Sequence, residues 1–207
     1  MNKTIIFKLL LLFMFVPTMI CANDREKYNF NLQWQLKVGD FKGAEKSNYF
    51  DKDWKKITLP HAWNEDEAFK VNIRHMTDSI CWYRKHFKIP ATAKDKKVFI
   101  EFEGIRMAAD VWLNGKHVGL HENGVMAFGL DLTPYLNFGG ENVIAVRTDN
   151  DWRYKERATG SRYQWNDINF NANYGGIPKN VWLHITNKLY QTLPLYSNLQ
   201  TTGVYVY

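Results

Sequence analysis

The 207-residue chain has little cysteine and little helical patterning. Its two cysteines are Cys21, which falls inside an N-terminal leader, and Cys81. Without the leader Cys81 is unpaired, and its neighbours Ile80, Trp82 and Tyr83 predict a buried, inert thiol rather than a nucleophile. After the leader no segment of helical period exceeds a turn or two, and there are no internal repeats or low-complexity tracts. These absences favour an all-β domain.

The charge pattern also lacks a basic stripe. The formal net charge is +6, but Lys and Arg alternate with Asp and Glu, as in residues 51–56 and 94–97. Nucleic-acid binding is therefore not expected. The hydrophobic fraction of 45% and aromatic fraction of 15% exclude disorder as the main state. The aromatics exceed what a core of this size needs, so some are expected at a surface or interface.

The first residues predict export. Met1–Thr4 is a short basic start, and the apolar run Ile5–Val16 is too short for a spanning helix. Smaller residues follow, so residues 1–22 are predicted to be a secretory signal cleaved near Ala22, and the protein to be periplasmic or secreted. Lipid anchoring through Cys21 is the alternative, against which the bulky Ile20 argues.

Period-2 alternation predicts a series of short strands. The alternating stretches are residues 30–36, 81–89, 98–102, 109–113, 126–132, 143–148 and 181–185. Residues 23–28 are polar and expected to be irregular, while Thr133 as N-cap and Pro134 predict a single helical turn. Many short strands between turn residues indicate an all-β sandwich, a jelly roll with one or two short helical turns.

One hairpin is predicted most clearly. Asn114 and Gly115 both tolerate positive φ and lie between two apolar-rich arms, which is typical of a type I′ turn. The resulting register turns Val111 and Leu113 toward the core and Trp112 away from it.

Seven pieces of the sequence, in order, resemble the N-terminal sugar-binding domain of glycoside hydrolase family 2, the family of β-galactosidases, β-glucuronidases and β-mannosidases. The pieces are Leu59–Asn64, Trp82–Pro90, Phe102–Ile105, Ala109–Gly115, Phe128–Thr133, Gly140–Asn142 and Tyr174–Leu183. The resemblance implies a galactose-binding-like jelly roll over residues 23–188. It also implies that residues 189–207 form a linker and the first strand of a truncated immunoglobulin-like domain.

In that family the two catalytic glutamates lie in a following TIM barrel. A barrel needs about 250 residues of alternating strands and helices, which this chain lacks. The candidate carboxylates within this chain are Glu122, Asp149, Asp151, Glu156 and Asp167. Their spacing does not mark the close pair that retaining hydrolysis requires, so no catalytic residue is assigned. His117 and His121 have no third ligand at a diagnostic spacing, so no metal or cofactor is expected.

Sugar contact is instead expected downstream of the hairpin, where aromatic rings could stack on sugars and amides and acids could bind hydroxyls. The candidate residues are Trp152, Tyr163, Trp165, Asp167, Asn169, Asn171 and Tyr174. The resemblance makes Asp167 the best match to a residue that reaches the barrel's active site in some family members. Packing of the same segment against the barrel is the alternative.

The leading hypothesis is a non-catalytic domain of an exported, β-galactosidase-like family 2 hydrolase in carbohydrate metabolism. Its partners would be a β-glycoside and a catalytic barrel, supplied in cis or from an adjacent reading frame. Two alternatives stay open: a stand-alone carbohydrate-binding module, and an interaction domain that holds subunits together, for instance in a homo-oligomer.

Overall fold

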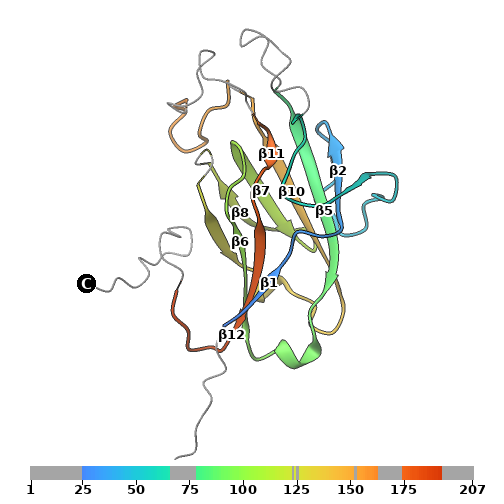
Figure 1. Ribbon diagram of the computed structural model, residues 1–207, viewed down its shortest axis with the longest axis vertical. Helices are drawn as coiled ribbons and strands as arrows, with labels where there is room; N and C mark the ends of the chain where they lie inside the picture. The colour runs from blue at the N-terminus through green and yellow to red at the C-terminus, as the bar shows by residue number, and fades with distance from the viewer. Residues whose placement is uncertain are drawn as a thin grey trace, which may run out of the picture.

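The structure, a computed structural model, describes residues 25–65, 78–122, 124, 126–151, 153–162 and 174–192. Two large antiparallel sheets, a two-stranded pair and two short 3-10 turns, η1 (Ala91–Ala93) and η2 (Thr133–Tyr135), account for its regular structure. Figure 1 shows the sheets as the two layers of a sandwich. The predicted all-β class is therefore confirmed. In the described part, no helix is long and apolar enough to cross a membrane.

The smaller sheet has four strands in the order β1-β12-β6-β9. Their bounds are β1 Glu26–Asn29, β12 Val181–Thr186, β6 Lys97–Phe102 and β9 Phe128–Asp131. The expectation of an irregular segment at residues 23–28 is wrong for β1, which pairs with β12 from Glu26 to Asn29. Three of its four side chains are exposed, so hydrogen bonding to β12 creates this strand without an apolar pattern.

The larger sheet has six strands in the order β3-β2-β5-β10-β7-β8. Their bounds are β3 Lys55–Ile57, β2 Trp34–Val38, β5 Ile80–Lys88, β10 Glu141–Asp149, β7 Ala108–Leu113 and β8 Lys116–His121. A further pair, β4 (His61–Ala62) and β11 (Gly176–Ile177), lies toward the upper end of the view in Figure 1.

The core lies between the two sheets and follows the predicted alternation. Val98, Ile100 and Phe102 of β6 are fully buried. Val111 and Leu113 of β7 join them in a single cluster. Alternation fails at Met126, predicted to share a face with Phe128, because β9 begins only at Phe128 and Met126 is 52% exposed.

The predicted hairpin forms between β7 and β8. Asn114 has φ 53° and Gly115 has φ 80°, as a type I′ turn requires. The Asn114 side chain also donates to Tyr135 O and Asn142 Oδ1, both at 2.9 Å. The turn therefore ties the hairpin to η2 and to the start of β10 as well as setting its register.

The prediction that Thr133 is the N-cap of η2 is wrong. Leu132, not Thr133, occupies the N-cap, and no side chain caps the turn. The Thr133 hydroxyl instead accepts the backbone N–H of Val98 at 2.9 Å. Thr133 thus extends the hydrogen bonding of β6, an interaction that local sequence does not reveal.

The outer face of the six-stranded sheet is partly covered by residues 39–54. Arg84 of β5 projects to this face, as its alternation predicts, yet it is fully buried. Its Nε donates to Asp51 Oδ2 at 2.7 Å, and its guanidinium also donates to the carbonyl of Lys46 at 3.0 Å. A buried cation therefore anchors this covering segment to the sheet.

Candidate functional site

The predicted sugar-contact segment connects β10 to β11. The predicted residues Trp152, Tyr163, Trp165, Asp167, Asn169 and Asn171 lie outside the described residues. Tyr174 is described and half-buried, directly before Gly175. Asn150 and Gly175, at the two described ends of this connection, both contact Trp63. The connection therefore leaves and returns at the same end of the sandwich.

Five residues form what we call the strand-end cluster: Trp63, Asn64, Ser79, Asn150 and Gly175. Asn150 Oδ1 accepts from Trp63 Nε1 at 3.2 Å and from the Ser79 N–H at 3.1 Å. Asn64 Oδ1 accepts the backbone N–H of Gly175 at 2.8 Å. The backbone N–H of Trp63 donates to Gly175 O at 3.1 Å. Both amide side chains are almost fully buried, so they fix the positions from which the connections at this end depart.

Two glycines allow this close approach. A Cβ on Gly175 would lie 2.1 Å from Trp63 Nε1, and one on Gly176 would lie 2.0 Å from the Tyr83 hydroxyl. Gly176 also has φ 93°, a conformation that disfavours other residues. The Gly-Gly pair of the Tyr174–Leu183 motif therefore packs directly on the Leu59–Asn64 motif and on β5.

Acidic and basic groups meet where β10 ends. Burial raises the pKa of the Asp149 carboxyl. The pKa of the Asp151 carboxyl is lowered, mainly by its hydrogen bond with Arg153, whose guanidinium lies 2.8 Å from it. Arg153 also lies 3.8 Å from Asp78, which precedes β5. This pairing links two neighbouring connections at the same end of the sandwich.

Residues 153–162, which we call the arm, fold back on themselves and contact β7 and β8. The Glu156 N–H donates to Ser161 O at 2.9 Å, which closes the arm as a small hairpin. Glu122 Oε1, just after β8, accepts from the Tyr154 hydroxyl at 2.5 Å and from the Arg157 N–H at 2.9 Å. The described part of the predicted segment is therefore held by side chains rather than free.

The strongest contact of the arm is an ion pair. Both terminal nitrogens of Arg157 hydrogen-bond to the Asp110 carboxylate on β7. Asp110 is only 5% exposed, and His117 Nε2 lies 3.1 Å from it. The sequence offers no spacing signal for this pair, because Asp110 and Arg157 are 47 residues apart.

The two histidines have different surroundings. His121 stacks on Phe128, with ring centroids 4.0 Å apart, and burial lowers its pKa to about 4. His117 bonds to Asp110, and no group of three potential metal ligands occurs among the described residues. Cys81 is fully buried, as the sequence predicts, and burial raises the pKa of its thiol.

The candidate catalytic carboxylates have other partners. Glu122 binds Tyr154 and the arm, and Asp151 binds Arg153. Glu156 accepts from the Thr159 hydroxyl at 2.6 Å. Asp167 lies outside the described residues. Asp149 Oδ1 accepts the backbone N–H of Asp151 at 3.0 Å. In the described part these contacts stabilise loops.

Residues 52–183 match the family model described as "Glycosyl hydrolase 2 galactose-binding domain-like". A β-glucuronidase of Formosa agariphila is 43% identical over 195 residues, which cover 91% of this chain and 20% of that protein. A β-galactosidase of Thermoanaerobacter pseudethanolicus is 35% identical over 79% of this chain and 21% of its own length. The chain thus spans about a fifth of the curated relatives that it matches.

A solved β-glucuronidase from glycoside hydrolase family 2 superposes with a TM-score of 0.78 at 42% identity. The superposition covers 89% of this chain and 20% of that structure. The residues matched by the family model include the strand-end cluster, the Asn114–Gly115 hairpin and most strands of both sheets.

Proposed function

The chain belongs to the glycosyl hydrolase 2 galactose-binding domain-like family, and on that premise we propose that it is a non-catalytic, sugar-binding domain of an exported β-glycosidase in carbohydrate metabolism. The proposal rests on the match across the whole sandwich to family 2 enzymes. The matched part makes up about a fifth of the length of those enzymes. The carboxylates of Glu122, Asp151 and Glu156 are hydrogen-bonded to neighbouring groups, which supports a non-catalytic role.

In this proposal the strand-end cluster holds the connections that shape a glycan site. The β10–β11 connection would supply Trp165 for stacking and Asp167 for hydroxyl binding beside a catalytic barrel. The buried amides of Asn64 and Asn150 support this role, because they rigidify the points from which the connection leaves and returns.

The substrate proposed for the whole enzyme is a β-glycoside. Named relatives include a β-glucuronidase and β-galactosidases, so glucuronides and galactosides are the two classes to compare. Export through the leader at residues 1–22, with lipid anchoring at Cys21 as the alternative, belongs to the same proposal.

A domain replacement tests the proposal. Residues 25–188 of this chain would replace the matching domain of the 43% identical β-glucuronidase, beside an enzyme with that domain deleted. The replacement is expected to restore hydrolysis of nitrophenyl β-glucuronide, and Asp167→Asn within it to lower kcat/KM by about tenfold.

Asn137→Asp, remote from the β10–β11 connection, is the matched amide–acid exchange for comparison. If a soluble replacement enzyme is as inactive as the deleted one, the proposed role is wrong. If activity returns but Asp167→Asn has no effect, only the assignment of Asp167 is wrong.

A further inference from the structure

The outer face of the six-stranded sheet carries an open depression of about 660 Å³, which we call the sheet-face depression. Its floor is formed by outward side chains of four strands, and its rim by residues 40–45 and by the arm. Its lining includes Trp82, Asp110, Trp112, His117, Arg147 and Arg157. None of them belongs to the sugar-contact set predicted from the sequence.

Strand register explains why these side chains meet. Trp82 of β5 pairs with Arg147 of β10, and Arg147 pairs with Asp110 of β7. These three residues therefore form a row across the sheet. In the next row Ala145 pairs with Trp112, and Ala145 is fully buried against Trp82 and Trp112. The small alanine lets the two indoles approach, with centroids 5.3 Å apart and planes 30° apart.

The polar groups of the depression are held in place by one another. The Arg147 guanidinium donates twice to Asp40, at 3.0 and 2.8 Å, and Trp82 Nε1 donates to the same carboxylate at 3.2 Å. On the opposite rim, the Arg157 guanidinium donates to both oxygens of the Asp110 carboxylate. A guanidinium has five donors, so Arg147 and Arg157 retain N–H groups for a ligand, and the half-exposed Asp40 carboxylate retains an acceptor position. The depression thus offers fixed donors and acceptors beside aromatic rings.

The charges of the lining balance. Lys42, Arg147 and Arg157 oppose Asp40, Glu45 and Asp110. Anionic and cationic ligands would each meet repulsion as well as attraction, whereas a neutral ligand rich in hydroxyls can use both kinds of group. The Trp112 ring, half-buried and edged by His117 at 5.3 Å, supplies an apolar platform.

We propose that the sheet-face depression binds a neutral oligosaccharide. Trp112 stacks on the C–H face of one sugar ring, and the Arg147–Asp40 and Arg157–Asp110 pairs bind its hydroxyls. His117, whose side chain is 48% exposed, borders the same platform. This binding involves no bond cleavage, so it does not depend on the proposed glycosidase role and extends glycan contact from the loop end of the sandwich to the sheet face.

The test titrates the purified full chain with β-1,4-galactotetraose, a neutral probe, and with tetragalacturonate, an anionic one. Nuclear magnetic resonance would follow the indole N–H groups of Trp82 and Trp112 and the Nε–H of Arg147. The neutral probe is expected to shift all three signals, and Trp112→Ala is expected to weaken its binding by about tenfold.

Two further variants keep the test decisive. Trp182→Ala removes an outward tryptophan from the other sheet, where Lys27 lies 4.3 Å from its ring, and should leave the affinity unchanged. His117→Ala alters a half-exposed side chain, so the fold should persist while affinity falls by about threefold. Loss of affinity in both Trp112→Ala and His117→Ala, with none in Trp182→Ala, supports the proposal.

Four results would overturn it. The first is tighter binding of tetragalacturonate than of the neutral probe. The second is a shift of the Trp63 indole N–H while the signals of Trp82, Trp112 and Arg147 stay in place. The third is unchanged affinity in both Trp112→Ala and His117→Ala, and the fourth is no shift at about 50 mM neutral probe. Protection of Trp112 from hydroxyl-radical footprinting in the domain-replaced enzyme would also contradict it, because another domain would then be the occupant.

Discussion

Lys85 has an unusual environment for a lysine. It lies on β5 with only 7% of its surface exposed, and its Nζ donates to the carbonyls of Phe30 and Leu32 at 2.9 and 2.7 Å. The ammonium also lies 3.8 Å from the centre of the Phe30 ring. It therefore clamps the turn between β1 and β2 onto the larger sheet, and burial lowers its pKa from 10.5 to about 8.

This pKa predicts a pH dependence of stability. Between about pH 8 and 10.5 the unfolded chain holds a proton on Lys85 that the folded chain has released, so the free energy of unfolding rises with pH in that window. Denaturant titrations should show the wild type gaining up to about 3 kcal/mol relative to Lys85→Met from pH 8 to 10.5. Parallel pH profiles for the two proteins would disprove the lowered pKa.

Gly176 gives a second test at the residue scale. Gly176→Ala would place a Cβ 2.0 Å from the Tyr83 hydroxyl at φ 93°, and a loss of about 3 kcal/mol or more in unfolding free energy is expected. Gly160→Ala is the matched control, because Gly160 has φ 68° with nothing within 4 Å of the added Cβ. The control should lose only about 1 kcal/mol in thermal or denaturant unfolding. Equal losses would show that backbone conformation, rather than the packing of Gly176, sets the cost.

Among the elements, the arm combines local hairpin bonds with side-chain contacts to β7 and β8. Arg157 reaches a carboxylate that is almost fully buried, whereas Arg153 pairs with Asp151 at the foot of the arm. A buried carboxylate that loses its partner is costly, while an exposed pair contributes little. The Asp110–Arg157 pair should therefore hold the arm, and Arg153 should not.

Hydrogen exchange can separate these contributions. Arg157→Gln is expected to raise amide exchange in residues 153–162 by about tenfold or more, while Arg153→Gln leaves it nearly unchanged. Arg157→Lys should recover only part of the protection, because one ammonium cannot replace the guanidinium fork. Equal exchange in Arg157→Gln and the wild type would mean that Glu122 and Tyr154 suffice to hold the arm.

The elements differ in how far sequence alone predicts them. β6, β7, β10 and β12 carry an apolar residue at every second position because that face packs in the core. The Asn114–Gly115 turn fixes its register through local φ values. β1 escapes prediction because its order comes from pairing with β12, 150 or more residues away. The burial of Arg84 escapes it too, since residues 39–54 cover this side chain only in the folded chain.

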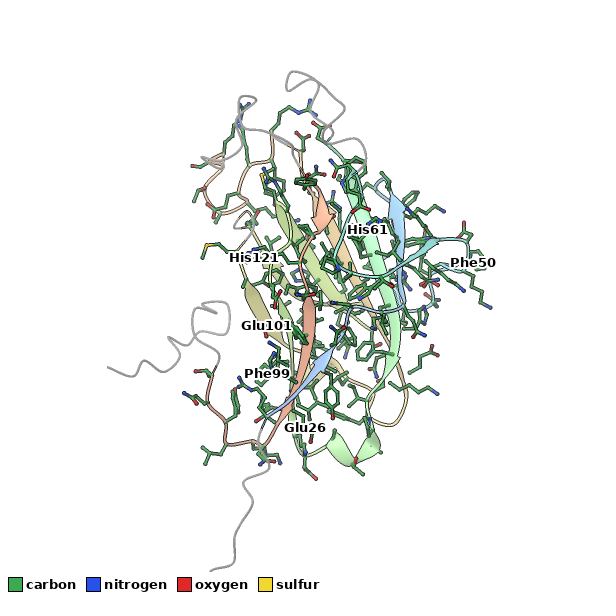
Figure 2. The ribbon with its side chains drawn as sticks, viewed as in Figure 1. Glu26, Phe50, His61, Phe99, Glu101 and His121 are labelled. Atoms are coloured by element: carbon green, nitrogen blue, oxygen red, sulfur yellow. The ribbon has the colours of Figure 1, made fainter. Side chains whose placement is uncertain are left out.

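At the scale of the whole molecule, the two sheets enclose one core and present different surfaces. Figure 2 shows Glu26 at the lower end, His61 in the upper half and Phe50 at the edge formed by residues 39–54. The order of the motifs predicts the sandwich because each motif contains a strand or turn of the core. The partners within the candidate site cannot be predicted in the same way, because contacts such as Asn64 with Gly175 join residues 111 positions apart.

We expect this domain to serve a glycosidase without performing hydrolysis itself. The most direct measurement is release of nitrophenol by the purified chain from nitrophenyl β-glucuronide and nitrophenyl β-galactoside across pH 4 to 8. We expect a rate no higher than in buffer alone, because the carboxylates of Glu122, Asp151 and Glu156 are hydrogen-bonded to neighbouring groups. Turnover above buffer that a single carboxylate-to-amide variant of this chain abolishes would contradict it.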